Sequence, residues 1–263
     1  MWQLISRSVW LNCQWQINVE QVSKMGLKRH NLHSCAQLVE FVDRIGFLPL
    51  LRMGVAGWSA EEQVDEDCQY TKLPDGGWKW DLWQWKGDVI RESGCAYGKF
   101  FDGKAGFISK ALWPDFCNWR RSRLGQFEAD SVEAMVLETL KQHGSLITRE
   151  LRAACGFTEP KMRSRFDTFI THLEMAGLVV TEDFVYPRTR QGKRYGWGWA
   201  LLTTPEVLFG REACHPDCSP EESYGRLIEH LRKVFPDASD DFFKFILVDD
   251  KNYFLLVIRL IFN

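Results

Sequence analysis

The stretch LVVTEDFVYPRTRQGKRYGWGWALL, residues 178–202, predicts a β-hairpin and decides the fold expected for this chain. Residues 178–186 and 195–202 are rich in branched and aromatic side chains, which favour strands. Between them, residues 188–194 form a charged turn around Gly192. The hairpin follows a run of helical patterns, and that order indicates the fold.

Three helices are expected before the hairpin. Asp130 and Glu133 fit a capping box at the start of the first, and Gly144 ends it. The second begins at Thr148 and stops at Gly156. The third follows and places its apolar residues on one face: Met162, Phe166, Phe169, Ile170 and Leu173. Three helices and a hairpin predict a winged helix-turn-helix over residues 127–210.

The expected fold class is therefore α+β, mainly α. Residues 1–126 form a tryptophan-rich, helical N-terminal region, with helices predicted over 32–42 and from Ser59. Residues 211–263 form a helical C-terminal segment. Within it, residues 221–235 predict an amphipathic helix with these inward side chains: Leu227, Ile228, Leu231 and Val234.

Charge is distributed unevenly along the chain. The net charge is -2, so the whole protein carries no basic field, and any nucleic-acid binding must come from a local patch. Residues 61–94 are acidic, whereas residues 99–123 and 161–194 are basic. The two basic segments are candidates for such a patch, although solvated surfaces of one domain also explain them.

The candidate DNA contacts come from these basic segments. In a helix-turn-helix unit the recognition helix enters the major groove, and we expect the wing to touch the backbone. The expected partner is double-stranded DNA, and the alternative is a winged helix that binds proteins. The predicted contacts are Lys161, Arg163, Arg165, Arg188, Arg190, Lys193, Arg194, Arg120 and Arg121.

Several motifs resemble one bacterial family. They are IGFLPL from Ile45, GWSAEE from Gly57, DLWQWK from Asp81, YGKFFDGKAGFISKALWPDFCNWRR from Tyr97 and KRYGWGWALLTTPE from Lys193. These motifs, which span roughly residues 45–210, are similar to the sequences of the AlkZ-related family. That family is grouped with winged-helix DNA-binding proteins that include the AlkZ and YcaQ DNA glycosylases. The resemblance implies a cytoplasmic, winged-helix protein with a role in DNA repair or damage recognition.

The sequence is compatible with both a catalytic and a non-catalytic protein. The glycosylases place water with a Gln-x-Gln or Gln-x-Asp motif, whereas the similar stretch here, residues 45–52, has Pro49 and Leu51. Weak catalytic candidates are carboxylates near aromatic residues, whose pKa values rise in apolar surroundings: Asp81, Glu62 and Asp115. Helix capping or pairing with lysine also explains them. A glycosylase-like enzyme for alkylated bases and a non-catalytic interaction or regulatory module stay as alternatives.

The remaining motifs point away from cofactors, metals and membranes. Eight cysteines without repeated CxxC pairs indicate reduced thiols in the cytoplasm. CHPDC, residues 214–218, lacks a second ligand pair, so no metal site is expected. No phosphate loop is present, and no cofactor is expected. The apolar run 253–263 is too short to span a bilayer. The sequence indicates no oligomeric state.

Four tryptophans fall within GWKWDLWQWK, residues 77–86: Trp78, Trp80, Trp83 and Trp85. They predict either a surface on which bases stack or part of a core. Their period-two spacing breaks after Trp80, which favours a helix starting at Asp81, with Asp81 as N-cap. We therefore expect packing between domains, joined by Trp113 and Trp119.

Overall fold

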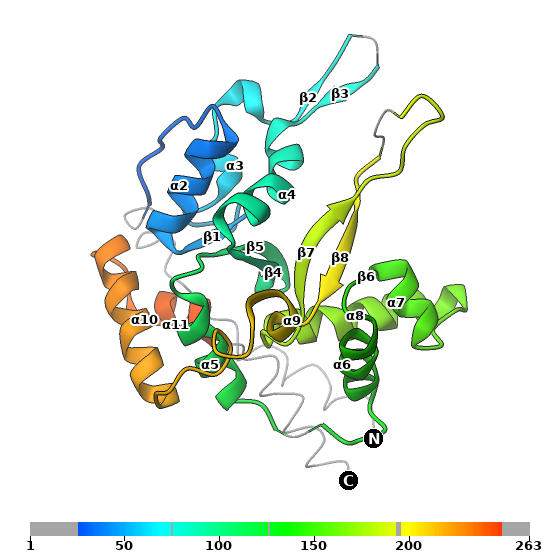
Figure 1. The fold of residues 1–263 in the computed structure, drawn as a ribbon. Coiled ribbons are helices and arrows are strands. Elements are labelled where there is room, and N and C mark those ends of the chain that lie inside the picture. The colour runs from blue at the N-terminus through cyan, green and yellow to red at the C-terminus, as the bar shows by residue number, and fades with distance from the viewer. Residues whose placement is uncertain (1–25, 75, 126, 193–195, 249–263) are drawn as a thin grey trace, which may run out of the picture.

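The computed structural model describes residues 26–74, 76–125, 127–192 and 196–248 (Figure 1). Over these residues the protein is α+β, as expected. Predictions for Lys193, Arg194 and the apolar run 253–263 lie outside the described residues. Among the described helices, none combines the length and apolarity that crossing a bilayer requires.

A three-stranded antiparallel sheet lies at the centre of the N-terminal region. Its order is β1 (Phe47–Pro49), β5 (Lys104–Ile108) and β4 (Ala96–Phe101). Neighbouring side chains enter different hydrophobic clusters: Phe47 lies in one and Leu48 in the other. This alternation is what a strand with both faces covered requires. The sheet therefore has two cores, one on each face.

Helices cover both faces of this sheet. One core contains α2 (Cys35–Ile45) and α4 (Asp81–Ser93). The other contains α5 (Trp113–Ser122) and two C-terminal helices, α10 (Pro220–Val234) and α11 (Asp240–Leu247). Residues from the first and last parts of the chain thus share one hydrophobic cluster. The division into parts 1–126, 127–210 and 211–263 stays a prediction.

The predicted helix over 221–235 is confirmed as α10. Ser219 caps it, and the Ser219 amide and hydroxyl both donate to the Glu222 carboxylate in a capping box. Leu227 and Leu231 are buried, and Ile228 packs beside them. The apolar stripe on this helix therefore faces the core, as its spacing predicts.

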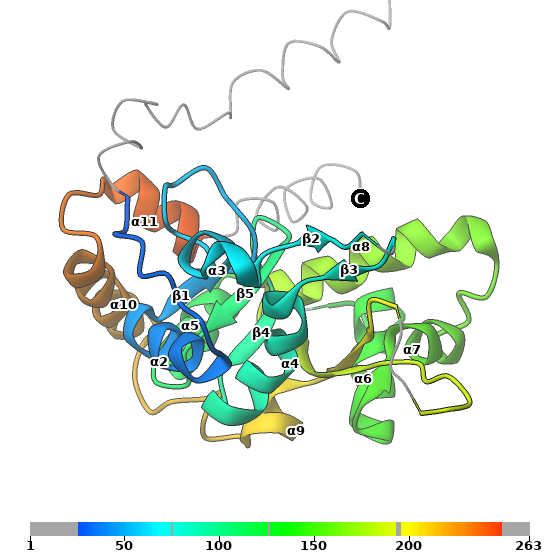
Figure 2. The same cartoon turned by 90° about the horizontal axis from the view of Figure 1, so that it is seen from above.

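A second unit holds the predicted helices and hairpin. Its helices are α6 (Val132–His143), α7 (Thr148–Ala154) and α8 (Arg163–Met175). The hairpin is β7 (Val180–Val185) and β8 (Trp199–Thr203). Its hydrophobic cluster comes from residues 127–202 alone. Figures 1 and 2 show the unit on the side of the molecule opposite α10.

The predicted order of three helices and a hairpin is confirmed, with two corrections. A short strand, β6 (Leu146–Ile147), pairs with β8 and gives the sheet order β6-β8-β7. The capping box expected at Asp130 is wrong, because Ser131 is the N-cap and its hydroxyl accepts from the Ala134 amide at 3.1 Å. Serine and aspartate both cap helices, so the sequence alone did not show which of the neighbours Asp130 and Ser131 is the N-cap.

The shorter elements complete the chain. They are α3 (Ala60–Gln63), 3₁₀ helix η1 (Glu66–Cys68), β2 (Thr71–Lys72), β3 (Trp78–Lys79), 3₁₀ helix η2 (Pro160–Met162) and α9 (Pro205–Phe209). Ser59 caps α3, as predicted. The helix predicted at Asp81 is confirmed as α4, but its N-cap is Trp80. The β2–β3 and β7–β8 hairpins project from the same side of the molecule (Figure 1).

Candidate nucleic-acid interface

The β7–β8 hairpin has an inner and an outer face. On the inner face, Phe184 packs against the core that contains α4. On the outer face, Val185 and Trp199 stand directly opposite each other across the two strands, and both are exposed. Opposed residues of an antiparallel pair share a face of the sheet. Phe184 is therefore fixed to the N-terminal region, whereas Val185 and Trp199 are exposed on the other side of the strands.

An ion-pair network fixes strand β7, which lies at the edge of its sheet, to α4. Arg91 bonds to Asp183 of the hairpin and to Asp88 of its own helix. Gly87 allows the close approach, because a Cβ there would lie 2.9 Å from the Asp183 Oδ1. A side chain at this position would therefore push the Asp183 carboxylate out of its present place.

Lys86 lies in the same contact and is only 2 % exposed. Its Nζ lies 3.2 Å from the centroid of the Trp83 ring and 3.9 Å from that of Phe184. Burial lowers the pKa of the Lys86 ammonium to about 7. The rings attract the charged form through cation–π contacts, which oppose that shift. This lysine joins α4 to the hairpin.

The hairpin is also held by a tryptophan box, which we define as Trp78, Trp80, Trp83 and Trp197. Trp78 and Trp197 stack with centroids 4.6 Å apart and planes 10° apart. Trp80 and Trp83 meet the Trp197 ring edge to face. The Trp83 Nε1 donates to the Trp197 carbonyl at 3.0 Å. Indole packing between the two regions is thus confirmed, and Trp85 packs against the neighbouring core.

Trp113 and Trp119 do not join this box, so that part of the prediction is wrong. Trp113 is buried against Phe100 and Phe116 in the other core. Trp119 packs on Tyr224 of α10, with ring centroids 4.4 Å apart. Both lie on α5, on the side of the sheet away from α4, and that separation could not be inferred from their spacing.

Exposed arginines line the start of α8 and the tip of the hairpin. Within the described residues, no carboxylate lies within 4.0 Å of their guanidinium groups. They are Arg163, Arg165, Arg188 and Arg190. Lys161 is exposed too, but its Nζ pairs with Glu159 at 2.9 Å. Most predicted contacts on α8 and the hairpin therefore keep their charge available.

Arg120 has a structural position instead of the predicted DNA contact. It is 3 % exposed. Its guanidinium donates to the carbonyls of Leu247 and Ile246, both at 2.8 Å, and Met175 at 2.7 Å. These bonds tie α5 to α8 and α11, so a phosphate cannot reach this side chain in the structure.

Arg121 is also engaged. It pairs with Glu206 of α9 and donates to the Gly177 carbonyl at 2.7 Å. Lys99, in the same basic segment, pairs with the buried Glu174 at 3.4 Å. Arg120, Arg121 and Lys99 therefore bond to groups within the protein. They do not extend the cationic surface of α8 and the hairpin.

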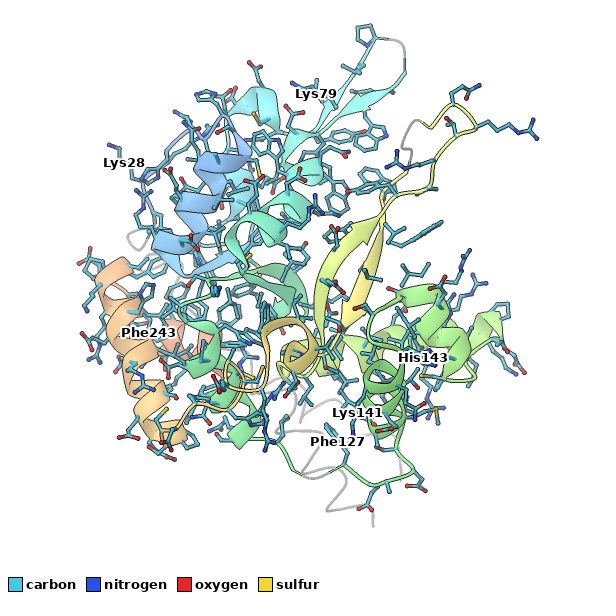
Figure 3. The ribbon with its side chains drawn as sticks, viewed as in Figure 1. Lys28, Lys79, Phe127, Lys141, His143 and Phe243 are labelled. Carbon is cyan, nitrogen blue, oxygen red and sulfur yellow. The ribbon has the colours of Figure 1, made fainter. Side chains whose placement is uncertain are left out.

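The three weak catalytic candidates each have a partner. Asp81 pairs with Lys79 at 3.0 Å, beside the β2–β3 hairpin (Figure 3). The Glu62 carboxylate accepts from the Ser59 hydroxyl at 2.7 Å. Asp115 accepts from Ser223 at 2.8 Å and pairs with Arg226 of α10. Capping and ion pairing account for all three positions.

The stretch that resembles the glycosylase motif lies in β1. Pro49 is buried and pairs with Gly106 of β5 from the edge strand β1, and Leu51 follows that strand. Neither side chain can bond water. In the described part of the chain, no three His, Cys, Asp or Glu side chains are grouped to hold a metal ion.

A family model described as AlkZ related matches residues 32–247. The chain belongs to the AlkZ-related family. The resemblance inferred from residues 45–210 is thereby confirmed, and the matched region of this AlkZ-related chain also takes in α2, α10 and α11. No curated protein and no solved structure matches it.

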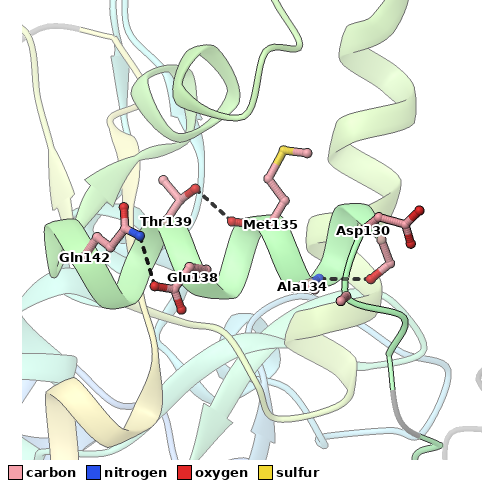
Figure 4. Close-up of a pocket in the computed structure, with 8 residues that line it drawn as sticks. Asp130, Ala134, Met135, Glu138, Thr139 and Gln142 are labelled. Carbon is pink, nitrogen blue, oxygen red and sulfur yellow. Dashed lines mark hydrogen bonds between the residues drawn. The ribbon is translucent and has the colours of Figure 1, made fainter.

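This AlkZ-related chain also has a shallow pocket of about 300 Å³ along α6 (Figure 4). Its polar groups bond to one another: the Gln142 amide donates to Glu138 at 2.9 Å, and the Thr139 hydroxyl to the Met135 carbonyl at 2.8 Å. It contains no lysine or arginine. The pocket therefore adds nothing to a nucleic-acid surface.

Three residues in or beside the β7–β8 hairpin of this AlkZ-related chain were not predicted: Lys86, Trp199 and Arg149, whose Cζ lies 5.3 Å from the centroid of the Trp199 ring. Lys86 follows the four indoles of residues 77–86, which hints at an aromatic environment but not at burial. Trp199 belongs to an alternating Gly–Trp pattern that resembles strand sequence. Arg149 gives no local signal, because its position depends on how α7 packs against the sheet.

Proposed function

We propose that residues 127–210 form a winged helix-turn-helix that binds double-stranded DNA. The order of its elements supports the assignment: three helices, a short strand between the first two, and a hairpin. The separate hydrophobic cluster of residues 127–202 supports treating it as one unit. The start of α8 would enter the major groove and the β7–β8 hairpin would contact the backbone.

The observation that carries the proposal is the contrast between two sets of cations. Arg163, Arg165 and the hairpin arginines have no carboxylate partner among the described residues, whereas Arg91 and Arg121 are paired. Exposed guanidinium groups without partners are suited to phosphate oxygens. Lys161 would contribute to DNA binding once its ammonium leaves Glu159 and pairs with a phosphate. Lys193 and Arg194 stay predicted contacts.

Membership of the AlkZ-related family supports a biological role in DNA repair or damage recognition. The winged-helix proteins that this family resembles include DNA glycosylases. A DNA-binding protein with a role in repair binds duplex DNA and recognises a lesion within it. A cytoplasmic location fits this role.

Salt-dependent binding tests the proposal directly. The affinity of the full chain for a duplex is measured by fluorescence anisotropy at several salt concentrations. We expect the affinity to fall steeply with salt, and each lost phosphate contact to reduce the slope by about one. The variants Arg163→Gln/Arg165→Gln and Arg188→Gln/Arg190→Gln should each weaken binding and flatten the slope.

The matched control removes two cations from α10. Arg232 and Lys233 are exposed and pair with Asp240 and Glu229. The double variant Arg232→Gln/Lys233→Gln should bind the duplex like the unaltered chain. A salt-insensitive affinity, or equal losses in all three double variants, would show that α8 and the hairpin are not the contacts.

An excision assay separates the competing functions. A duplex containing an alkylated base is incubated with the protein, and base release is measured. Release that is lost in Asp81→Asn or Glu62→Gln supports a glycosylase-like enzyme. Binding without release supports the proposal, and absence of both, with a protein partner recovered instead, supports an interaction or regulatory module.

A further inference from the structure

The outer face of the β7–β8 hairpin carries exposed apolar side chains. Trp199 is 42 % exposed and Val185, directly across from it, is 40 % exposed. Both belong to strands whose other face is packed, so the exposure is not the result of a loose segment. An exposed indole beside an exposed valine forms an apolar surface of the kind that binds a partner.

A bend separates Trp199 from the tryptophan box. In a regular strand Trp197 and Trp199 would point the same way. Gly198 between them has a φ of +74°, and the Tyr186 ring lies 2.9 Å from where a Cβ would be. Trp197 therefore turns into the box: Trp78 covers one face of its ring, and the residue as a whole is 49 % exposed. Trp199 remains on the outer face.

One cation lies beside Trp199, and two more lie towards the tip of the same hairpin. The Arg149 Cζ lies 5.3 Å from the centroid of the Trp199 ring. Arg188 and Arg190 follow at the tip of the same hairpin, and neither has an ion-pair partner in the part of the chain that the structure describes. The guanidinium of Arg188 donates to the Gly192 carbonyl at 3.2 Å, which holds it at the tip.

An indole beside Arg149, on a hairpin with two unpaired arginines towards its tip, matches the chemistry of one ligand in particular. A nucleotide combines a flat apolar base with an anionic phosphate, and bases stack on tryptophan whatever their sequence. In a duplex the faces of each base are covered by its neighbours, so a side chain on a rigid hairpin can stack only on a base that has left the helix. The surface therefore suits an unpaired nucleotide better than a paired one.

We propose that Trp199, with Arg149 and the arginines at the hairpin tip, binds an unpaired nucleotide of DNA by stacking on its base and pairing with its phosphates. The proposal rests on the DNA binding proposed above and specifies its ligand: duplex DNA that carries an extruded or unpaired base. The hairpin is anchored by Asp183, Phe184 and Trp197. The stacking surface is thus already in place before DNA binds.

The test compares two duplexes that differ in one unpaired nucleotide. One is fully paired and the other has a single-nucleotide bulge. We expect the unaltered chain to bind the bulged duplex about tenfold more tightly, as one base stacked on an aromatic ring allows. Trp199→Ala should lose that preference while its affinity for the paired duplex changes less than about twofold, and Trp199→Phe should keep part of it.

Tyr70 provides the matched control, because it is an exposed aromatic residue that belongs to neither strand of the β7–β8 hairpin and meets only Trp80 of the tryptophan box. Tyr70→Ala should leave the preference unchanged, and circular dichroism establishes that each variant is folded. Equal affinity of the unaltered chain for both duplexes, or a preference that survives Trp199→Ala, overturns this inference and leaves the duplex-binding proposal standing. Failure to bind either duplex overturns both.

Discussion

Lys86 is a charged residue that the fold keeps almost fully buried between two aromatic rings. Its pKa falls from 10.5 to about 7 because burial penalises the ammonium. Between those values the unfolded chain holds a proton that the folded protein has released. The unfolded state then binds more protons, so the free energy of unfolding contributed by this group rises with pH.

Replacing Lys86 with methionine should remove this pH dependence. Lys86→Met keeps an unbranched side chain in the same space and eliminates the titrating amine. Chemical denaturation at pH 7 and pH 9 should show the unaltered chain gaining about 1–2 kcal/mol relative to the variant as pH rises. The variant should be the more stable of the two at pH 7. If both respond to pH alike, the rings hold the amine charged at neutral pH.

The same measurement on Lys110→Met provides the control. Lys110 is exposed, so its replacement should leave the pH dependence unchanged. Comparing the variants with the unaltered chain also cancels the contribution of the buried thiols. Burial raises the pKa of Cys35 to about 11 and that of Cys95 to about 12, which acts in the opposite direction at high pH.

The arginine residues show which parts of the candidate site could be predicted from the sequence and which could not. The charge pattern predicted cations on α8 and the hairpin, and those described are exposed there. It predicted Arg120 equally, yet that guanidinium is buried among main-chain carbonyls of three distant segments. Only tertiary packing separates the two cases, because an isolated arginine has the same charge and helix propensity in both.

At the scale of elements, local patterns predicted what depends on neighbouring residues. The three helices, the hairpin and α10 have amphipathic spacing and end near glycine or a capping serine. The strands of the N-terminal sheet were not predicted. They are buried on both faces, so their sequences lack the period-two alternation that identifies a strand. Two-residue β6 forms only because β8 pairs with it.

The hairpin depends on the tryptophan box for its position, and this gives an element-scale prediction. Trp197→Ala removes the stack on Trp78 and the two edge contacts. We expect faster amide hydrogen exchange in β7 and β8, because the strands lose an anchor while their own ladder remains. The loss in stability should be about 1–3 kcal/mol.

Trp199→Ala is the matched comparison for this experiment. Trp199 lies on the exposed outer face, two residues away along the chain, and takes no part in the box. Its replacement should leave exchange in β7 close to that of the unaltered chain. Equal exchange in the two variants would mean that the box does not hold the hairpin, and that Arg91 and Lys86 suffice.

At the scale of the whole molecule, a net charge of -2 is compatible with a cationic surface because several cations elsewhere in the described residues pair with carboxylates. Lys99, Arg91 and Arg121 pair within the fold, and Lys233 pairs along α10. A long-range basic field is therefore absent, and affinity for a polyanion has to come from short-range contacts. Short-range contacts favour recognition of local DNA structure over non-specific steering.

The shared core of the first and last parts of the chain leads to a prediction about folding. Phe242 of α11 lies 5.1 Å from Trp58 and 5.2 Å from Phe235, ring centroid to centroid. Phe242→Ala should cost about 3–5 kcal/mol, because it opens a cavity in a cluster that cannot collapse around it. Since Trp58 belongs to the N-terminal region, that region should lose stability together with the C-terminal helices.

Denaturation followed by two signals tests this coupling. Tryptophan fluorescence reports mainly the N-terminal region and the hairpin, and far-ultraviolet circular dichroism reports all helices. Both should move to lower denaturant by the same amount in Phe242→Ala, whereas Lys244→Ala, an exposed change on the same helix, should move neither. A fluorescence transition that stays in place while part of the helical signal is lost would show that residues 211–263 fold independently. In that case the contact between Phe242 and Trp58 would join two domains and would not belong to one core.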